Sequence, residues 1–191
     1  MRWGLLLLAV GCRYYGSTTP RPRSSHVEAG AYAGVHVFSA DNSLGSLRDS
    51  ASFGARAGAF IGGHFGVEAQ LAVTPTEASA AVYDVWVLMT EAHLVYEPLA
   101  DTGDPRAVPF LYAGASAYDV VSSGGTPGTE ITSGTLVAPD AGLGIKYPLP
   151  DDWGVRADAT VVLPSSVDGG LTEDYELTLS IYRSFSTQSE R

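Results

Sequence analysis

Cysteine and lysine are almost absent from this sequence. One cysteine, Cys12, and one lysine, Lys146, occur among the 191 residues, and 21 acidic residues stand against 11 basic ones. A single cysteine excludes an internal disulfide. The net charge of −10 leaves no basic patch that could hold a row of phosphates. We therefore predict no nucleic-acid partner, and we attribute the excess of acid to solvated loops.

The sequence also lacks the common motifs of catalysis and metal binding. It contains no GxSxG, HExxH or P-loop motif. Its four histidines, His26, His36, His64 and His93, do not have the spacing of metal ligands. We therefore predict no catalytic residue, no metal and no cofactor. One alternative stays open, because a lipid-modifying barrel enzyme would need only a serine and a histidine close together at one rim.

No segment has the pattern of a useful amphipathic helix, and the N-terminal apolar run is short. Residues 1–12 read MRWGLLLLAVGC, in which Arg2 precedes the apolar core. That core is too short to span a bilayer and is typical of a secretion signal. Ala9-Val10-Gly11-Cys12 resembles a bacterial lipobox, although alanine stands where leucine is preferred. We predict a signal peptide over residues 1–11 and lipidation of Cys12. The alternative is an ordinary signal with an incidental cysteine, or a misplaced start codon.

The rest of the chain divides into a linker, one domain and a tail. Residues 12–26 contain Pro20 and Pro22 among serines and threonines, which is the composition of a linker. A strand pattern occupies residues 27–185, which we predict to be a single β-barrel domain, and residues 186–191 remain as a C-terminal tail.

The stretch from residue 53 to residue 74, FGARAGAFIGGHFGVEAQLAVT, alternates as two strands folded back on each other. Residues paired across a hairpin point the same way, so Ile61 must pair with Phe65 to bring the apolar residues onto one face. The loop between them then has three residues, GGH, because a two-residue Gly-Gly turn would send one apolar set to the other face. The same register places Arg56 diagonal to Glu68 on a face otherwise lined with glycine.

Six further segments alternate in the same way. Together with the hairpin they give eight strands, over residues 27–39, 53–61, 65–74, 82–96, 108–121, 136–147, 153–163 and 175–185. Eight is the number at which an up-and-down sheet closes with an interior just filled by side chains. The two faces of the fifth strand cannot be told apart, because Phe110 and Tyr112 alternate with Leu111 and Ala113.

Alternation alone does not say which face lies inside the barrel. A soluble lipocalin-like barrel would bury the apolar set, and a membrane barrel would turn it to lipid. Lipid is favoured because the polar set is mostly glycine, the strands have the length of about ten residues that a bilayer needs, and aromatic residues gather near strand ends. The expected aromatic girdles are Tyr83, Trp86, Tyr118 and Tyr175 at one rim and Tyr96, Phe110, Tyr147, Trp153 and Phe185 at the other. We predict an all-β fold, an eight-stranded antiparallel up-and-down transmembrane β-barrel.

Loop lengths alternate along the chain, which supports that topology. Short turns are expected at residues 62–64 and 148–152, and longer loops at residues 40–50, 122–134 and 164–174, with the long turn at residues 97–106 as an exception. This alternation predicts that both termini lie on the periplasmic side.

Two stretches of the sequence resemble the small OmpA-type outer-membrane β-barrel family. FGARAGAFIGGHFGVEAQLAVTPTEAS looks like the second and third strands of that family, and GLGIKYPLPDDWGVRADATV looks like the sixth and seventh. The C-terminal strand that ends in Phe185 is similar to the family's assembly signal, although six residues follow it here. The resemblance covers roughly residues 27–185 and implies the barrel architecture and an outer-membrane location. It does not imply an activity, because the fold has structural, adhesive, receptor and enzymatic members.

Seven ionisable residues are predicted to point into the barrel as a lumen charge network: Arg56, Glu68, Glu91, His93, Lys146, Arg156 and Asp158. Arg56 is expected to contact Glu68, and Lys146 to lie diagonal to Arg156 if the turn between their strands centres on Pro150. One interpretation is an ion path or a ligand pocket. The other is a structural network, because buried charges persist only when they are paired.

The sequence therefore predicts a non-enzymatic barrel of the bacterial outer membrane whose lumen is plugged by side chains. Its role would be structural, or its surface loops would bind a ligand whose identity is unknown. We predict that outer-membrane lipid is its partner and that the barrel is a monomer. The alternative is a secreted, soluble lipocalin-like barrel that carries a small apolar ligand and is anchored through Cys12.

Overall fold

The computed structural model describes residues 25–39, 47–77, 84–99, 107–122, 135–165 and 170–186. The eight strands are β1 (His26–Val37), β2 (Ser50–Ile61), β3 (Phe65–Glu77), β4 (Asp84–Tyr96), β5 (Val108–Ser122), β6 (Thr135–Pro148), β7 (Trp153–Val162) and β8 (Asp174–Ser186). No helix long and apolar enough to cross a membrane occurs among the described residues. The predicted signal peptide, Cys12, nearly all of the linker, Tyr83, the end of the tail and most of the expected long loops lie outside them.

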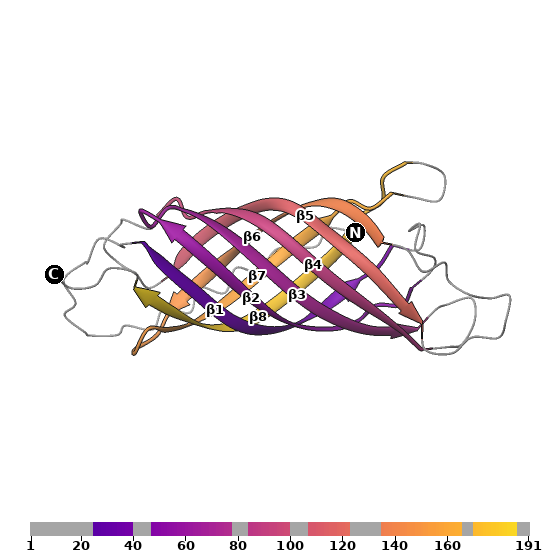
Figure 1. The fold of residues 1–191 in the computed structure, drawn as a ribbon, viewed down its shortest axis with the longest axis horizontal. Coiled ribbons are helices and arrows are strands. Elements are labelled where there is room, and N and C mark those ends of the chain that lie inside the picture. The colour runs from indigo at the N-terminus through magenta and orange to yellow at the C-terminus, as the bar shows by residue number, and fades with distance from the viewer. Residues whose placement is uncertain are drawn as a thin grey trace, which may run out of the picture.

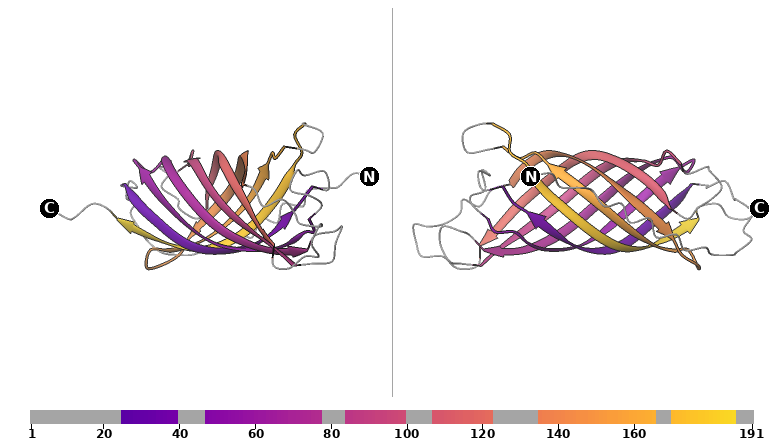
Figure 2. Two further views of the ribbon diagram at one scale, coloured as in Figure 1. Left: turned by 45° about the vertical axis from the view of Figure 1, so that its right-hand side comes forward. Right: turned by 180° about the vertical axis from the view of Figure 1, so that it is seen from behind.

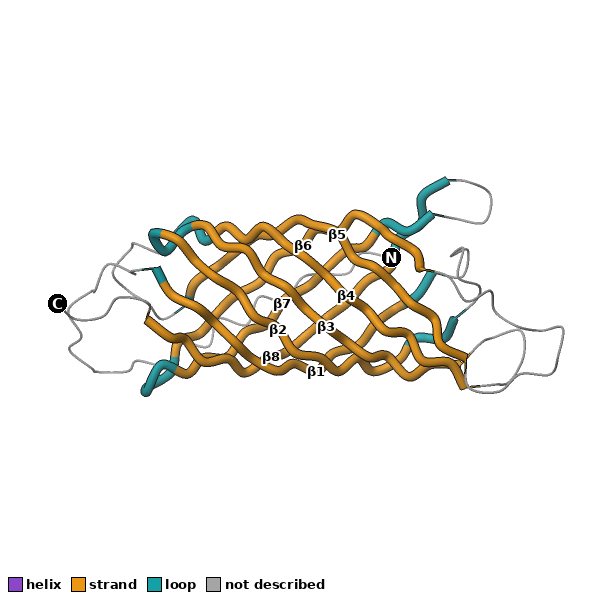
Figure 3. The backbone as a smooth tube through the Cα atoms, in the orientation of Figure 1, coloured by secondary structure: helices purple, strands orange, loops and turns teal. Residues whose placement is uncertain are grey.

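The strands form one closed barrel in which each strand pairs antiparallel with its sequence neighbours (Figure 1). β1 also pairs with β8, from His26–Ser186 to Val37–Tyr175, and this pairing closes the sheet. Figure 2 shows the strands tilted around a common axis, and Figure 3 shows the described loops at the two ends of the barrel. The predicted eight-stranded antiparallel up-and-down barrel is confirmed.

The two ends of the barrel carry different connections. The start of β1, the end of β8 and the β2–β3 and β6–β7 turns lie at one end, which we call the turn end; the opposite end is the loop end. Because the strands tilt, a row of paired residues followed once around the sheet climbs along the barrel axis. A row that starts at Pro148 of β6 returns to that strand at Ala138, nearer the loop end.

The apolar face of every strand points outward. Ile61, Leu94 and Leu179 are 76%, 71% and 70% exposed, and the alternate residues on their strands are buried. Such a continuous apolar surface would be far too large for a monomer in water and is that of a barrel surrounded by lipid. The alternative of a soluble lipocalin-like barrel, which would bury this face, is therefore wrong.

The hairpin between β2 and β3 has the predicted register. Ile61 pairs with Phe65, and Gly58 pairs with Glu68, so three residues form the loop. Gly62 and Gly63 have φ angles of +61° and +77°, in the left-handed region that glycine adopts without strain. Glycine at these two positions allows the tight connection that the apolar pattern requires.

The β6–β7 turn differs from its prediction by one residue. Pro148 pairs with Gly154, so the turn centres on Asp151 and not on Pro150, and Lys146 lies directly opposite Arg156. Asp151 and Asp152 both have a φ angle of 62°. Two of the four residues in this connection are therefore in the left-handed conformation, which aspartate tolerates better than most residues do.

Strand β5 turns its largest aromatic side chains inward. Phe110, Tyr112 and Tyr118 are buried, and Leu111 is exposed. The prediction that Phe110 and Tyr118 belong to the outer girdles is therefore wrong. Trp86, Tyr96, Tyr147, Trp153, Tyr175 and Phe185 are exposed, as expected for girdle residues.

Glycines on neighbouring strands accommodate these inward rings. Phe110 pairs with Gly144 and Tyr112 pairs with Gly142. A Cβ atom placed on either glycine would collide with the paired ring. The glycine-rich inner face thus leaves room for large aromatic side chains in a narrow lumen.

Candidate functional site

The lumen charge network is anchored near the turn end by Lys146. This lysine is fully buried, and its Nζ donates hydrogen bonds of 2.6 Å to Glu28 Oε2 and to Glu97 Oε1. The ammonium also lies 4.0 Å from the centroid of the Phe60 ring. His26 stacks on that ring at 4.9 Å, and its Nε2 lies 3.2 Å from Glu28 Oε1. One cation therefore holds two carboxylates, and an aromatic face supplements its pairing.

A second group surrounds Arg156 farther along the lumen. Its Nη1 donates to Glu68 Oε2 at 2.6 Å, and its Nε donates to Asp158 Oδ1 at 2.8 Å. Arg56 Nη1 donates to the same Asp158 oxygen at 3.0 Å. Thr178 completes the group, because its hydroxyl donates to Asp158 Oδ2 at 2.8 Å and accepts from Arg56 Nη2 at 3.2 Å. Two guanidinium groups and two carboxylates thus balance each other in charge.

These ion pairs join strands that are not neighbours in the sheet. Arg56 of β2 contacts Asp158 of β7, and Arg156 of β7 contacts Glu68 of β3. Lys146 of β6 contacts Glu28 of β1. Side chains of strands separated by other strands can meet in this way only across the lumen, so the network spans the interior of the barrel.

Arg56 does not pair with Glu68, contrary to the sequence prediction. The two are diagonal in the hairpin, as expected, but Arg56 reaches Asp158 and Glu68 reaches Arg156. The Arg56 guanidinium also lies 4.5 Å from the Tyr32 ring, and that of Arg156 lies 4.2 Å from the Phe110 ring. Each arginine thus lies over an inward aromatic ring as well as pairing across the lumen, and the ring supplements its ion pair.

A third group, nearer the loop end, contains acids without a permanent cation. His93 Nε2 lies 3.0 Å from Asp140 Oδ1 and 3.6 Å from Glu91 Oε2. Ser116 donates to Asp140 Oδ2 at 2.5 Å. Glu176 is also buried here, and one oxygen each of Glu91 and Glu176 has no hydrogen-bond partner. The carboxylates of this group are thus balanced by histidine and hydroxyl groups rather than by arginine or lysine.

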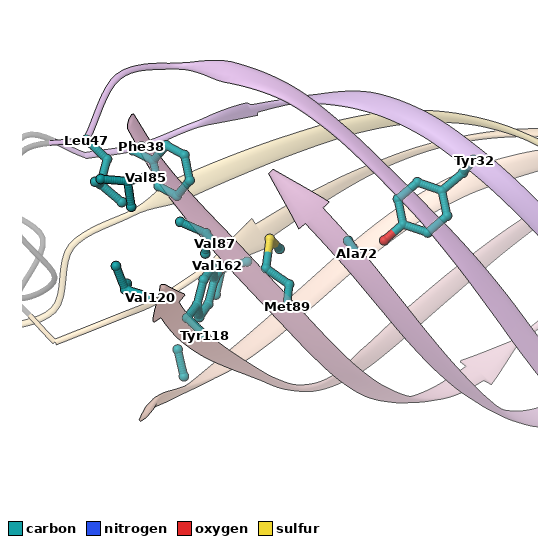
Figure 4. Packing of buried hydrophobic residues seen from close by; sticks show 11 residues of the cluster. Tyr32, Phe38, Leu47, Ala72, Val85, Val87, Met89, Tyr118, Val120 and Val162 are labelled. Atoms are coloured by element: carbon teal, nitrogen blue, oxygen red, sulfur yellow. The ribbon is translucent and has the colours of Figure 1, made fainter. Parts of the chain in front are cut away.

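An apolar cluster fills the lumen at the loop end. It is built from buried residues of six strands and two loop positions: Tyr32, Phe38, Leu47, Ala72, Val85, Val87, Met89, Tyr118, Val120, Ala138 and Val162. Figure 4 shows Val87, Tyr118 and Val162 gathered inside the barrel. Phe38 and Leu47 flank the β1–β2 connection and are 6% and 5% exposed, so they cover this end of the lumen.

All seven residues of the predicted charge network lie buried inside the barrel. Glu28, Glu97, Asp140 and Glu176 also lie there, and the prediction omitted them. Alternation could have identified Glu28, Asp140 and Glu176, because each shares the inner face of its strand. Glu97 was assigned to a turn, and no local pattern indicated that it contacts Lys146.

A crevice of about 550 Å³ opens at the loop end where the regular ladder between β2 and β3 ends. The pairing of these strands ends at Phe53 and Val73, although β3 continues to Glu77. Proline at position 75 has no N–H for a ladder hydrogen bond. The crevice is lined by Arg48, Asp49, Ser50, Pro75, Thr76, Glu77, Val85 and Trp86.

No group of three or more His, Cys, Asp and Glu residues in the described part of the chain is arranged to hold a metal ion. Among the same residues, His36 lies 4.0 Å from Asp174 and His93 lies near Asp140, but both pairs are buried inside the barrel. Neither histidine lies where a membrane lipid could reach it from a rim.

A family model of the outer membrane protein β-barrel domain matches residues 5–185. No curated protein matched the chain in a sequence comparison. Neisserial surface protein A superposes with a TM-score of 0.58 at 20% identity, over 84% of this chain and 97% of that one. The N-terminal barrel of Pseudomonas aeruginosa OprF gives 0.57 at 15%, over 86% and 100%. Yersinia pestis Ail, crystallised with the heparin analogue sucrose octasulfate, gives 0.51 at 14%, over 84% and 97%. These identities show a shared fold.

Proposed function

Because the chain belongs to the outer membrane protein β-barrel domain family, and is therefore a protein of the bacterial outer membrane, we propose that it is a non-enzymatic element of the envelope. Its lumen is plugged by side chains, and it acts through its structure or through binding at the loop end. The single observation that carries this proposal is the set of ion pairs that cross the lumen from β2, β3 and β7.

The plug has two parts that reinforce each other. Side chains joined by cross-lumen ion pairs occupy the lumen from the turn end to the middle, and an apolar cluster with further buried polar side chains, among them His36 and Asp174, occupies it toward the loop end. An ion that passed through would have to break buried ion pairs and then displace the packed side chains of the apolar cluster, and both steps are costly. An eight-stranded barrel also leaves too little space for a water-filled channel beside these side chains.

Conductance in a planar bilayer tests the plug. We expect the purified protein to give no steady current, while an open porin inserted under the same conditions gives stable steps. Insertion is verified separately by β-type circular dichroism and by folded protein that resists SDS until heated. Large and stable single-channel currents from correctly inserted protein would mean that the barrel is a pore and would overturn the proposal.

The loop end is the proposed site of any surface interaction. We propose that the turn end faces the periplasm and the loop end faces outside the cell, and the support is the alternation of short turns and long loops along the sequence. The crevice between β2 and β3 offers both an ion pair, Arg48 with Glu77, and the exposed ring of Trp86. The ligand that was crystallised with Ail is polyanionic. We expect a ligand of different charge here, because this chain carries a net charge of −10.

A complementation experiment separates the structural role from the binding role. In a strain that lacks the protein, the wild type should restore resistance to detergent. The variant Arg48→Ala with Glu77→Ala removes the crevice ion pair, which is exposed and contributes little to stability. Equal rescue by both proteins indicates a structural role, and rescue by the wild type alone indicates that the crevice binds a partner. Failure of the wild type to rescue contradicts both.

The N-terminus is proposed to carry a lipid on Cys12 after cleavage behind Gly11, and the barrel to be a monomer. The support is the short apolar signal that ends in a small residue and cysteine. Mass spectrometry of the mature protein should show a blocked, lipidated cysteine. An unmodified Cys12, or another mature start, rejects this part. Cys12→Ser should still assemble as a barrel, because the sheet closes without it.

A further inference from the structure

Arg183 is the one basic side chain on the outward face of the described parts of the eight strands. It lies in β8 between Ile181 and Phe185, which are both exposed on the apolar surface, while Tyr182 points inward. The other outward residues of β8 in this region are apolar. A charge on the lipid face is costly near the bilayer midplane but costs little near an interface.

The position of Arg183 along the barrel places it near the turn end. It pairs with Trp153, the first residue of β7, and β8 ends at Ser186. Trp153 and Phe185 are 42% and 48% exposed and form part of the aromatic girdle at this rim. The guanidinium therefore lies at the level where phospholipid headgroups meet the acyl chains.

Two aromatic rings hold the guanidinium in place. Its central carbon lies 5.8 Å from the ring centroid of Trp153 and 5.5 Å from that of Phe185. No carboxylate of the described residues forms an ion pair with Arg183, although Asp151 and Asp152 belong to the adjacent turn. A guanidinium stacked on rings keeps its N–H groups free at its edge, and that edge matches the geometry of a phosphate.

We propose that Arg183, Trp153 and Phe185 form a binding site for the phosphate of an anionic phospholipid in the leaflet around the turn end. The rings present the guanidinium, the guanidinium donates hydrogen bonds to the phosphate, and the outward apolar residues of β8 contact the acyl chains. A lipid bound here would fix the height of the barrel in the membrane at its β7–β8 corner.

Fluorescence quenching by brominated lipids tests the site directly. In a protein with Trp3→Phe and Trp86→Phe, Trp153 is the only tryptophan and reports on its nearest lipids. We compare vesicles of phosphatidylcholine that contain a small share of either brominated phosphatidylglycerol or brominated phosphatidylcholine. The site predicts an enrichment of phosphatidylglycerol at Trp153 of about fivefold, since one basic side chain near an anionic surface contributes this order of affinity.

Three variants complete the experiment. Arg183→Gln should abolish the preference, and Arg183→Lys should retain part of it, because lysine keeps the charge but loses the planar fork. In the matched control, Trp3→Phe with Trp153→Phe leaves Trp86 as the reporter at the loop end, where no preference is expected. Folding of each variant is checked by resistance to SDS before heating. Arg183 and Trp153 are both exposed, so we expect all three to fold.

Two outcomes overturn the proposal. Equal quenching by the two brominated lipids in the protein with Arg183 means that the guanidinium reaches water instead of lipid phosphate. An unchanged preference in Arg183→Gln means that another feature attracts the lipid. Millimolar inorganic phosphate is added as a separate arm against chloride of equal ionic strength. If phosphate alone removes the preference, the site binds free phosphate rather than a lipid, and the proposal fails.

Discussion

In the half of the lumen nearer the turn end, each permanent cation contacts at least one carboxylate: Lys146 contacts two, Arg156 contacts two and Arg56 contacts one. In the half nearer the loop end, Glu91 and Glu176 are equally buried, but oxygens of both have no hydrogen-bond partner. The described interior holds eight buried carboxylates and three permanent cations. The cations are concentrated where they can cross-link strands, and the loop half relies on apolar packing instead. This difference predicts that substitutions of equal chemistry have unequal effects in the two halves.

The largest effect is expected for Lys146→Met. This change removes the ammonium group that contacts Glu28 and Glu97 at 2.6 Å and leaves both carboxylates buried. Loss of one partner of a buried pair costs about 3–5 kcal/mol, and two pairs are broken here. Urea unfolding in lipid vesicles measures the loss. Adding Glu28→Gln and Glu97→Gln should restore much of the stability, and a loss under about 1 kcal/mol for Lys146→Met alone would contradict the buried pairing.

Arg56→Ala is expected to be the next most damaging change. It should lower the free energy of unfolding by about 3–5 kcal/mol, because it removes one of the cations that contact the buried Asp158 carboxylate. A double-mutant cycle with Asp158→Asn should give a coupling of about 0.5–3 kcal/mol. The parallel cycle with Glu68→Gln should give a smaller coupling, since Glu68 binds Arg156 and not Arg56. A coupling energy between Arg56 and Glu68 larger than that between Arg56 and Asp158 would instead support the Arg56–Glu68 pair that the hairpin register suggested.

Glu68→Gln and Glu91→Gln form a matched comparison between the two halves. The first weakens a 2.6 Å hydrogen bond from Arg156, and we expect a loss of about 1.5–3 kcal/mol in unfolding free energy. The second removes a charge that no arginine or lysine contacts, so stability should be unchanged or higher. Equal losses in parallel urea titrations would show that the loop half is also held by ion pairs.

The smallest effects are expected for two tyrosines of β5. Tyr112→Phe loses the hydrogen bond between its hydroxyl and Thr160 at 2.5 Å and should cost about 0.5–1.5 kcal/mol. Tyr118→Phe loses a buried hydroxyl without a hydrogen-bond partner, so thermal unfolding should show no loss. A larger loss for Tyr118 than for Tyr112 would mean that polar contacts stabilise the loop half after all.

The candidate site could be predicted in part from alternation. The inner face of each strand follows from a period of two residues, which predicted that Arg56, Glu68 and Arg156 point inward, and these side chains are buried. Their partners could not be predicted, because Asp158 lies on a strand that is distant from β2 around the sheet. The position of Glu97 inside the barrel was not predicted, because this residue follows the end of β4, where alternation no longer applies.

By itself the sequence determined the number of strands, the β2–β3 register and the outward direction of the apolar faces. The number of strands and the register depend on neighbours along the chain and on one hairpin, so alternation and turn length are sufficient for them. The direction of the apolar faces also required the glycine-rich polar set, the strand lengths and the aromatic residues near strand ends. Only the tertiary structure decided which face of β5 points inward, because Phe110 and Leu111 are both large and apolar. The glycines of β6 leave room for the Phe110 ring inside the barrel. It also decided which charges pair, because strand tilt and barrel closure bring Lys146 to Glu28 and Arg56 to Asp158 across the lumen.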